Sequence, residues 1–237
     1  MTATRRLVVN ADDFGLSPEV NAGILHAHRH GIVTSTSLMV RGRCAAQAVA
    51  GAAAHPQLAL GLHVDLGEWA CTSGRWHAVY AVVDTADATA VAAELERQLD
   101  RFRALTGRDP THLDSHQHVH RDEPVRSIMG VRARELRIPL RHHGRVQYCG
   151  AFYGQGRDGA PNRGAVSAAA LTTLIQRLPQ GVTELCCHPA AAPFSGSAYG
   201  DERLAELEAL CDPVVRRALD DGGVWLSTFD EALRDLR

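Results

Sequence analysis

The stretch RLVVNADDFGLSPEVNAGILHAHRHG, residues 6–31, contains the signals of a buried strand, a polar turn and a helix in direct succession. The apolar run at 6–10 predicts the strand. Ser17 followed by Pro18 predicts the start of the helix, with Ser17 as its N-cap, and Gly31 predicts its end. The chain therefore begins with a strand–turn–helix unit.

The same unit recurs along the chain. Further strands are predicted at 33–40, 58–66, 111–116, 138–142, 183–189 and 224–228, with helices between them and long loops at 67–86 and 143–164. About seven alternating strand–helix units predict an α/β protein with a parallel sheet, either closed as a barrel or open and doubly wound. No Pro- or Ser-rich linker interrupts the pattern, so a single domain over 1–237 is expected.

Composition narrows the class of protein. The chain is 45% hydrophobic and 22% charged, as globular proteins are, and its formal net charge of −2 argues against nucleic acid as a partner. The N-terminal residues contain no secretory apolar region, and no apolar stretch approaches the length of a membrane span. A cytoplasmic protein is therefore expected.

Polar side chains gather where the predicted strands end. They are Asp12, Asp13, His63, His116, Arg141 and His188. The carboxyl ends of the strands of a parallel barrel meet on one face, so these distant residues are expected to form one site.

One carboxylate and two imidazoles are a usual ligand set for a catalytic divalent metal, and Asp13, His63 and His116 fit it. These ligand types predict one divalent ion, with Zn²⁺ favoured and Co²⁺, Ni²⁺ or Mg²⁺ as alternatives. His118 and His120 alternate with His116 and would share one face of an extended strand with it. Local spacing therefore leaves open which of these three histidines is the ligand.

The paired carboxylates Asp12 and Asp13 indicate hydrolytic chemistry. A metal ion lowers the pKa of bound water, and Asp12, beside the metal-bound Asp13, would accept the proton of that water. His188 would protonate the leaving group. A simpler interpretation, in which the two carboxylates only cap the following helix, is weakened because Ser17 already caps it.

Several stretches resemble a known family. They are VVNADDFGLSPEVNAGILHAHRHGIVTSTSLMV (8–40), LALGLHVDL (58–66), PTHLDSHQHVH (110–120), AFYG (151–154) and ELCCHPA (184–190). In this order they resemble the YdjC-like carbohydrate deacetylases, which are similar in chemistry to the NodB-type polysaccharide deacetylases. The resemblance implies a distorted β/α barrel and metal-dependent removal of the N-acetyl group from an amino sugar.

The resemblance also implies the roles of single residues. Asp13, His63 and His116 correspond to the metal ligands. Asp12 corresponds to the base.

His188 corresponds to the acid or oxyanion partner, and Arg141 corresponds to an arginine that orients the base. The chain departs from the family pattern at Gln117, where relatives often have histidine. Trp69 and Trp76 in the segment 67–86 are candidates for stacking on a sugar ring.

A small amino sugar or oligosaccharide is therefore the expected partner, and a homodimer the expected assembly. Two other functions remain open from the sequence. One is a different metal-dependent hydrolase, such as a phosphoesterase or an amidohydrolase, built on the same face of the sheet. The other is a sugar- or metal-binding protein that has lost catalysis.

Overall fold

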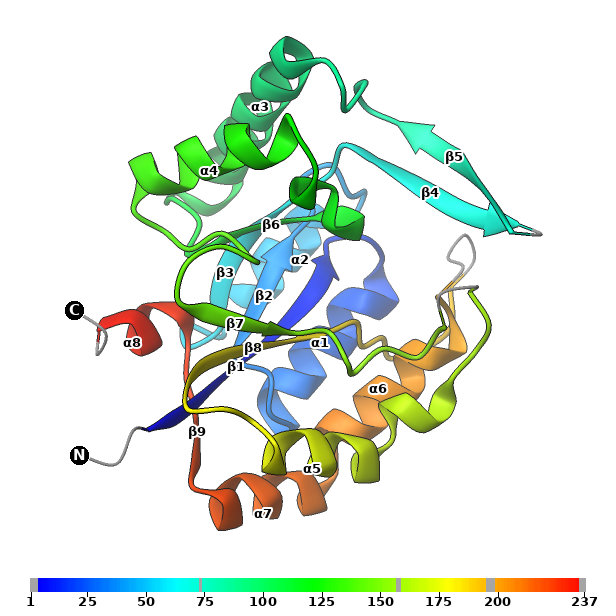
Figure 1. The fold of residues 1–237 in the computed structure, drawn as a ribbon, viewed down its shortest axis with the longest axis vertical. Coiled ribbons are helices and arrows are strands. Elements are labelled where there is room, and N and C mark those ends of the chain that lie inside the picture. Colours follow the sequence, from blue (N-terminus) through cyan, green and yellow to red (C-terminus); the bar gives the residue numbers. More distant parts are fainter. Residues whose placement is uncertain (1–3, 73, 157–158, 195–198, 235–237) are drawn as a thin grey trace.

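A curled parallel sheet forms the centre of the computed structural model, which describes residues 4–72, 74–156, 159–194 and 199–234 (Figure 1). In spatial order its strands are β6 (Leu113–Ser115), β3 (Ala59–Val64), β2 (Ser35–Leu38), β1 (Arg5–Phe14), β8 (Gly181–Cys187) and β7 (Val146–Cys149). A further strand, β9 (Val224–Leu226), pairs in parallel with the beginning of β1. The α/β class and the parallel sheet are confirmed, and the sheet curls as a half barrel.

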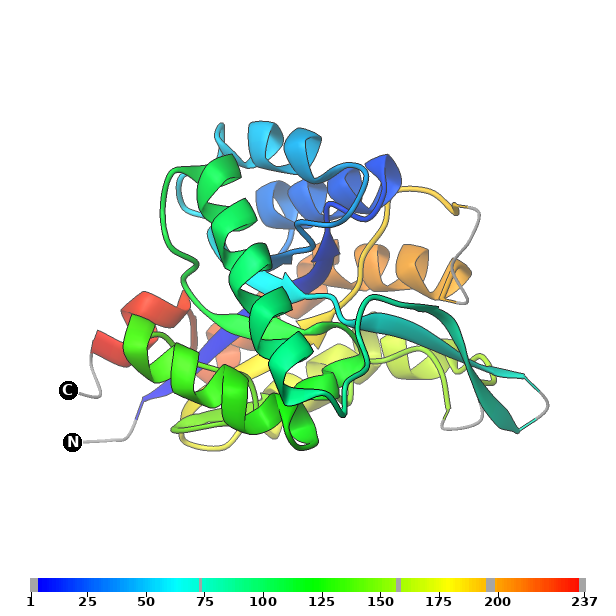
Figure 2. The same ribbon diagram turned by 90° about the horizontal axis from the view of Figure 1, so that it is seen from above.

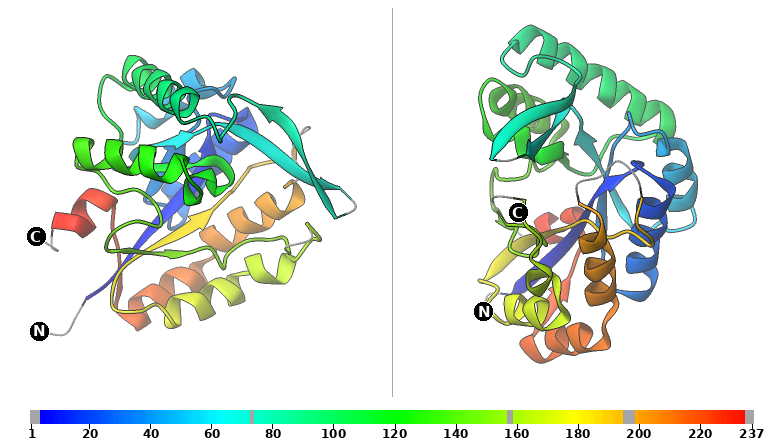
Figure 3. Two further views of the ribbon diagram at one scale, coloured as in Figure 1. Left: turned by 45° about the horizontal axis from the view of Figure 1, so that its top comes forward. Right: turned by 90° about the vertical axis from the view of Figure 1, so that its right-hand side faces the viewer.

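Most of the helices lie around the outside of the curled sheet (Figures 2 and 3), whereas Phe229 of the last one packs against its inner face. The helices are α1 (Pro18–His30), α2 (Ala45–Ala52), α3 (Ala88–Thr106), α4 (Val125–Leu136), α5 (Ala168–Gln176), α6 (Asp201–Cys211), α7 (Pro213–Gly222) and α8 (Phe229–Arg234), with 3₁₀ turns η1 (His116–Arg121) and η2 (Arg163–Val166). Ser17 caps α1 by accepting a hydrogen bond from the Val20 N–H, as predicted. Within the described residues, no helix combines the length and the apolar character that crossing a membrane requires.

Alternate residues of β1 point into the curl, and this period of two determines where polar groups lie. Val8, near the amino end of the strand, packs with Val182 and with Phe229 of α8. Asn10 and Asp12 follow on the same face and are buried. Val9 and Ala11, which alternate with these residues and point the other way, belong to the main apolar core under the helices. The inside of the curl is therefore apolar at the amino end of β1 and polar at its carboxyl end.

The strand predicted at 138–142 is wrong. Within the described residues of that segment, Leu140 alone bridges to β6, through Leu113. His142 follows with a φ of 64°, which ends the extended backbone. The strand of this region is β7, inside the predicted loop 143–164, where only four residues pair at the edge of the sheet. A pairing this short leaves little pattern in the sequence.

The segment 67–86 is not the predicted loop either. It forms an antiparallel ribbon of β4 (Gly67–Thr72) and β5 (Arg75–Ala81), which projects from the body of the protein in Figure 1. Every residue of β5 is exposed. Without a buried face, the ribbon has no alternation of apolar and polar residues, which is the signal that predicts strands.

Candidate active site

A cavity of about 640 Å³ opens at the carboxyl ends of the strands, where the site is predicted. The predicted residues in its lining are Asp12, Asp13, His63, His116 and His188. Arg141 is buried behind this lining and hydrogen-bonds to Asp12. The fold thus brings together six side chains that are scattered over residues 12–188.

Both neighbouring carboxylates reach the cavity because β1 ends irregularly. The register of β1 against β2 shifts between Ala11 and Phe14, and Asp13 has a φ of 67°. In a regular strand, adjacent side chains point to opposite faces. The left-handed conformation, which Asp tolerates better than most residues, lets Asp13 turn to the same side as Asp12.

Asp13 lies against the two histidines predicted as its partners. Its Oδ1 is 3.4 Å from His63 Nε2 and 3.2 Å from His116 Nδ1. This oxygen is buried and makes no hydrogen bond of good geometry within the described part of the chain. One ligand atom from each of the three residues lies within 4.8 Å of the others. A buried carboxylate oxygen facing two imidazole nitrogens fits a cation, and the three residues can hold a metal ion.

Two further side chains orient this group. Asp114 Oδ1 lies 2.7 Å from His63 Nδ1, which leaves His63 Nε2 facing Asp13. Such carboxylate–histidine pairs fix the orientation of metal-binding imidazoles. Arg203 of α6 donates a 2.6 Å hydrogen bond to Asp13 Oδ2. Burial opposes ionisation of Asp13, but the Arg203 guanidinium holds its pKa well below the usual range.

Asp12 is held by a bidentate ion pair. Arg141 donates to both carboxylate oxygens of Asp12, at 2.6 and 2.7 Å, and Asn10 Nδ2 donates to Oδ1 at 2.8 Å. Burial raises the pKa of Asp12, but the guanidinium overcomes this and holds the pKa well below the usual range. Asp12 is therefore an anion with a fixed orientation across the neutral pH range.

Arg141 binds more carboxylates than the sequence indicates. It contacts Glu184 and Asp114, each at 2.7 Å, in addition to Asp12. Burial raises the pKa of Glu184 to about 7, although Arg141 lowers it. Glu184 is not among the site residues predicted from the sequence. The available signal is a charged residue at the centre of β8, a strand otherwise buried and apolar or nearly so.

His188 lies beside Asp12 at the mouth of the site. Its Nε2 is 3.9 Å from Asp12 Oδ2, and its Nδ1 is 3.8 Å from Glu206 Oε1. The rings of Tyr153 and Tyr199 contact it edge-on, with centroids 5.5 Å away. His188 therefore lines the cavity, while its second nitrogen faces an acidic partner.

Arg203 and Glu206 on α6 were not predicted by the sequence. Charged residues in a helical pattern normally indicate a solvent face, yet both side chains are buried here. Nothing in the local sequence distinguishes them, because their partners Asp13 and His188 come from distant strands.

The three alternating histidines do not share a face, contrary to the extended strand considered for them. The segment is the 3₁₀ turn η1, with Gln117 and His118 in left-handed conformations at φ of 51° and 56°. His116 faces His63, with ring centroids 5.5 Å apart. His118 and His120 turn toward other partners. The backbone thereby singles out His116 to accompany Asp13.

The ribbon β4–β5 forms one rim of the cavity. Trp69 and Trp76 both line it, and the Trp76 side chain is exposed. Gln117 ties the ribbon to η1, because its side chain accepts from the Trp69 N–H and donates to the Trp69 carbonyl, both at 2.8 Å. The residue that departs from the family pattern therefore positions a tryptophan at the rim.

Comparison with known proteins defines the family. The model of the YdjC-like protein family matches residues 6–221. The chain belongs to the YdjC-like family. A chitooligosaccharide deacetylase of Klebsiella pneumoniae is 36% identical over 95% of this chain and 98% of its own length. A carbohydrate deacetylase of Geobacillus stearothermophilus is 33% identical over 96% and 98%. At the level of the family, the prediction of a carbohydrate deacetylase is confirmed.

Two solved structures have a similar fold. A protein of Enterococcus faecalis described as a candidate cellobiose-phosphate cleavage protein has a TM-score of 0.78 and 25% identity, covering 96% of this chain and 98% of that one. A family 4 carbohydrate esterase of Streptomyces lividans, in complex with acetate, has a TM-score of 0.56 at 13% identity, covering 96% and 93%. The second likeness concerns the fold, and it confirms the predicted deacetylase-like barrel.

Proposed function

We propose that this YdjC-like protein is a metal-dependent hydrolase that removes the N-acetyl group from an amino sugar and releases acetate. One observation carries the proposal. Asp12 and Asp13 are adjacent but have different partners, since Asp13 faces two imidazoles while Asp12 is anchored by Arg141. The deacetylase names of the relatives that cover nearly the whole chain support the same reaction.

Asp13, His63 and His116 would hold the divalent ion, and their nitrogen and oxygen donors favour Zn²⁺ over Mg²⁺. Lewis-acid chemistry, which polarises an amide carbonyl and lowers the pKa of water, is what such an ion supplies when bound. Asp114 and Arg203 keep the donors in place through His63 and Asp13. Neither of these two contacts needs to change during a reaction.

Asp12 would accept a proton from the attacking water as that water bonds to the acetyl carbon. Its orientation is fixed by Arg141 and Asn10, so the carboxylate is held in one position for the transfer. Because Arg141 keeps Asp12 ionised, the base is ready over the whole neutral pH range.

His188 would donate a proton to the sugar nitrogen as the carbon–nitrogen bond breaks, so that acetate and a free amine leave. Its Nε2 lies near Asp12, and its Nδ1 faces Glu206. This position, next to the proposed base and in the lining of the cavity, is the one a proton donor to the leaving nitrogen requires. Acid and base then lie beside one another at the reacting amide.

The lining of the cavity argues against a phosphoesterase. Among the described lining residues, Arg203 is the one Lys or Arg side chain, and it is bound to Asp13. Enzymes that act on phosphate esters usually hold the phosphate with free cationic groups. Tryptophans at the rim suit the apolar face of a sugar instead.

Acetate release tests the proposal. Purified protein loaded with Zn²⁺ is incubated with N-acetylglucosamine, its phosphorylated forms, diacetylchitobiose and longer chitooligosaccharides, and with p-nitrophenyl phosphate as the competing substrate class. Acetate release that a chelator abolishes and Zn²⁺ restores is expected from at least one saccharide. Phosphate release without acetate would favour the phosphoesterase, and saccharide binding without either product would favour a non-catalytic relative.

Three expectations from the sequence are retained as part of this proposal. They are one domain over 1–237, a homodimer and a location in the cytoplasm. The family match over 6–221 supports the first. Light scattering coupled to size-exclusion chromatography tests the second, and cell fractionation tests the third.

A further inference from the structure

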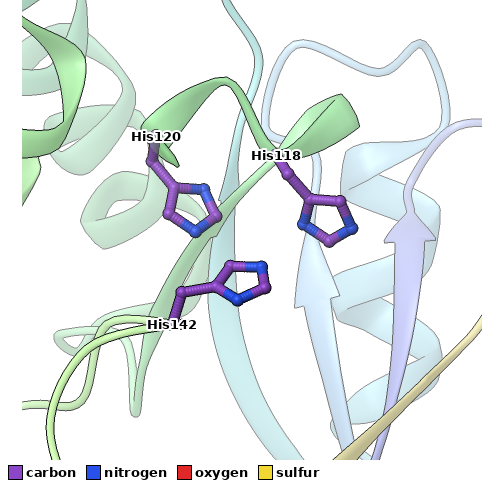
Figure 4. A group of neighbouring side chains, drawn as sticks. All are labelled: His118, His120 and His142. Atoms are coloured by element: carbon purple, nitrogen blue, oxygen red, sulfur yellow. The ribbon is translucent and has the colours of Figure 1, made fainter. Parts of the chain in front are cut away.

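A second group of imidazoles lies outside the constellation described above. His118 and His120 of η1 and His142, just after the Leu140 bridge, converge in Figure 4. Their ring centroids are 5.3 Å apart for His118–His142, 5.5 Å for His120–His142 and 6.0 Å for His118–His120. One ring nitrogen from each lies within 4.8 Å of the other two. This spacing allows the three side chains to share one ion.

Each of the three imidazole rings has one nitrogen without a hydrogen-bond partner among the described residues. His118 Nδ1, His120 Nε2 and His142 Nε2 are buried and have no hydrogen-bond partner among the described residues. A buried polar atom without a partner costs on the order of 1–3 kcal/mol, so three of them in one place call for a shared ligand. His120 is fully buried, which excludes bulk water as its partner.

The opposite nitrogens of two rings are already held. Ser115 Oγ lies 2.6 Å from His120 Nδ1, and Tyr148 Oη lies 3.1 Å from His118 Nε2. A second hydrogen bond of this kind fixes the orientation of a metal-binding imidazole and leaves its other nitrogen free to coordinate. These two contacts therefore leave the unpartnered nitrogens, His118 Nδ1 and His120 Nε2, as the donors.

The backbone is bent so that the rings can meet. Gln117, His118 and His142 have φ values of 51°, 56° and 64°, in the left-handed region. Residues other than glycine adopt this conformation at a cost of the order of 1 kcal/mol or more each.

We propose that His118, His120 and His142 bind a second divalent transition-metal ion, separate from the one held by Asp13. Three imidazoles without a carboxylate select Zn²⁺, Co²⁺ or Ni²⁺ and disfavour Mg²⁺ and Ca²⁺. The ion joins η1 to the segment after Leu140. His118 and Tyr148 line the active-site cavity, so the ion stabilises that wall of the cavity.

Zinc stoichiometry tests the site with the full chain. Metal-free protein is titrated with Zn²⁺ in competition with a chromophoric chelator, and circular dichroism checks that each variant is folded. The wild type is expected to bind two equivalents. His142→Ala is expected to bind one, and His116→Ala, which removes a ligand of the Asp13 group, is also expected to bind one. His143→Ala, a neighbouring histidine outside both groups, is the matched control and is expected to bind two.

Two results would overturn the proposal: a single equivalent in the wild type, or two equivalents in His142→Ala. If His142→Ala fails to fold, His118→Ala replaces it with the same expectation. One equivalent in the wild type that is lost in His116→Ala would remove the second site and keep the proposed function. Two equivalents of which His116→Ala removes none would instead contradict the ligand set of the proposed function.

Thermal unfolding gives a readout that is independent of activity. In the His116→Ala background, one equivalent of Zn²⁺ is expected to raise the melting temperature, because an ion that binds only the folded state stabilises it. The double variant His116→Ala/His142→Ala is expected to show no such rise. An equal rise in both proteins would contradict the proposal.

Discussion

Among the groups of three potential metal ligands in the described residues, two lie close together and differ in chemistry. Asp13, His63 and His116 combine a carboxylate with two imidazoles in the lining of the cavity. His118, His120 and His142 offer imidazoles alone. The first group is surrounded by ion pairs, whereas unpartnered nitrogens dominate the second. The ion pairs around the first group suit proton transfer, whereas a ligand set of imidazoles alone suits a structural ion.

Neighbouring residues in the sequence are divided between these two groups. His116 faces the first and His118 the second, and in the same way Arg141 binds Asp12 while His142 joins the second group. In both places a left-handed residue reverses the chain, with φ of 56° at His118 and 64° at His142. Proximity in sequence is therefore a poor guide to shared function where such reversals occur.

The largest expected effect separates the two groups by turnover. His116→Ala removes a ligand of the first group and is expected to lower kcat/KM for acetate release by about 10³-fold or more, since a catalytic metal contributes several kcal/mol to the barrier. His142→Ala removes a ligand of the second and is expected to lower it by less than ~10-fold, because it acts through the cavity wall. Equal losses in both variants would show that the groups are not distinct. Steady-state kinetics at saturating Zn²⁺ makes the comparison.

The next effect concerns the ion pairs that only the first group has. Arg141→Lys is expected to lower the free energy of unfolding by on the order of 3 kcal/mol, because lysine cannot bind three buried carboxylates in place of the planar guanidinium. Arg163→Lys is the control, since the exposed pair Arg163–Asp201 should change stability by less than ~1 kcal/mol. Denaturant titration measures both, and equal losses would contradict the account.

The ion pairs beside the first group should also make the free energy of unfolding depend on pH, through Glu184. Burial raises the pKa of Glu184 to about 7 from 4.5. Between these values the folded state binds more protons than the unfolded state, so this residue makes stability fall as the pH rises. Glu184→Gln removes that titration. From pH 4.5 to pH 8, the stability of the variant relative to the wild type is expected to rise by on the order of 3 kcal/mol.

Urea titrations at several pH values measure this difference. Glu208→Gln, at an exposed position on α6, provides the control and should follow the wild type across the range. Parallel curves for Glu184→Gln and the wild type would mean that Glu184 is ionised at neutral pH.

The smallest effect is expected at Gln117, between the two groups. Gln117→Ala loses both hydrogen bonds to the Trp69 backbone and so loosens the rim. KM for an acetylated saccharide is expected to rise by about threefold to tenfold, as loss of one or two modest hydrogen bonds implies. The expected change in kcat is less than twofold. A loss confined to kcat would place Gln117 with the catalytic residues instead.

Much of the fold could be predicted from the sequence because its signals are local. The capped start of α1 at Ser17 and its end at Gly31 depend on adjacent residues, and both lie where predicted. The ribbon β4–β5 and the strand β7 were missed because one is exposed and the other is short. Predictions of strands from alternation need a half-buried strand of several residues.

The residues of the site could be predicted where they stand at the ends of predicted strands. The six predicted residues lie together because each lies within, or just after, the carboxyl end of a segment that pairs in the sheet. Glu184 and Arg203 were missed since their partners, Arg141 and Asp13, are far away in sequence. The choice among the three alternating histidines also required the backbone, because a left-handed conformation leaves no signal at His118.

The central claim is that Asp12 transfers protons while Asp13 holds the metal. Asp12→Asn, loaded with Zn²⁺, tests it most directly, with bound zinc and acetate release measured on the same sample. The account predicts wild-type zinc content together with a loss of kcat of about 10²–10⁴-fold, the usual contribution of a general base. Retained turnover would contradict the role of Asp12, and loss of zinc in step with activity would show that the two carboxylates are not divided in function.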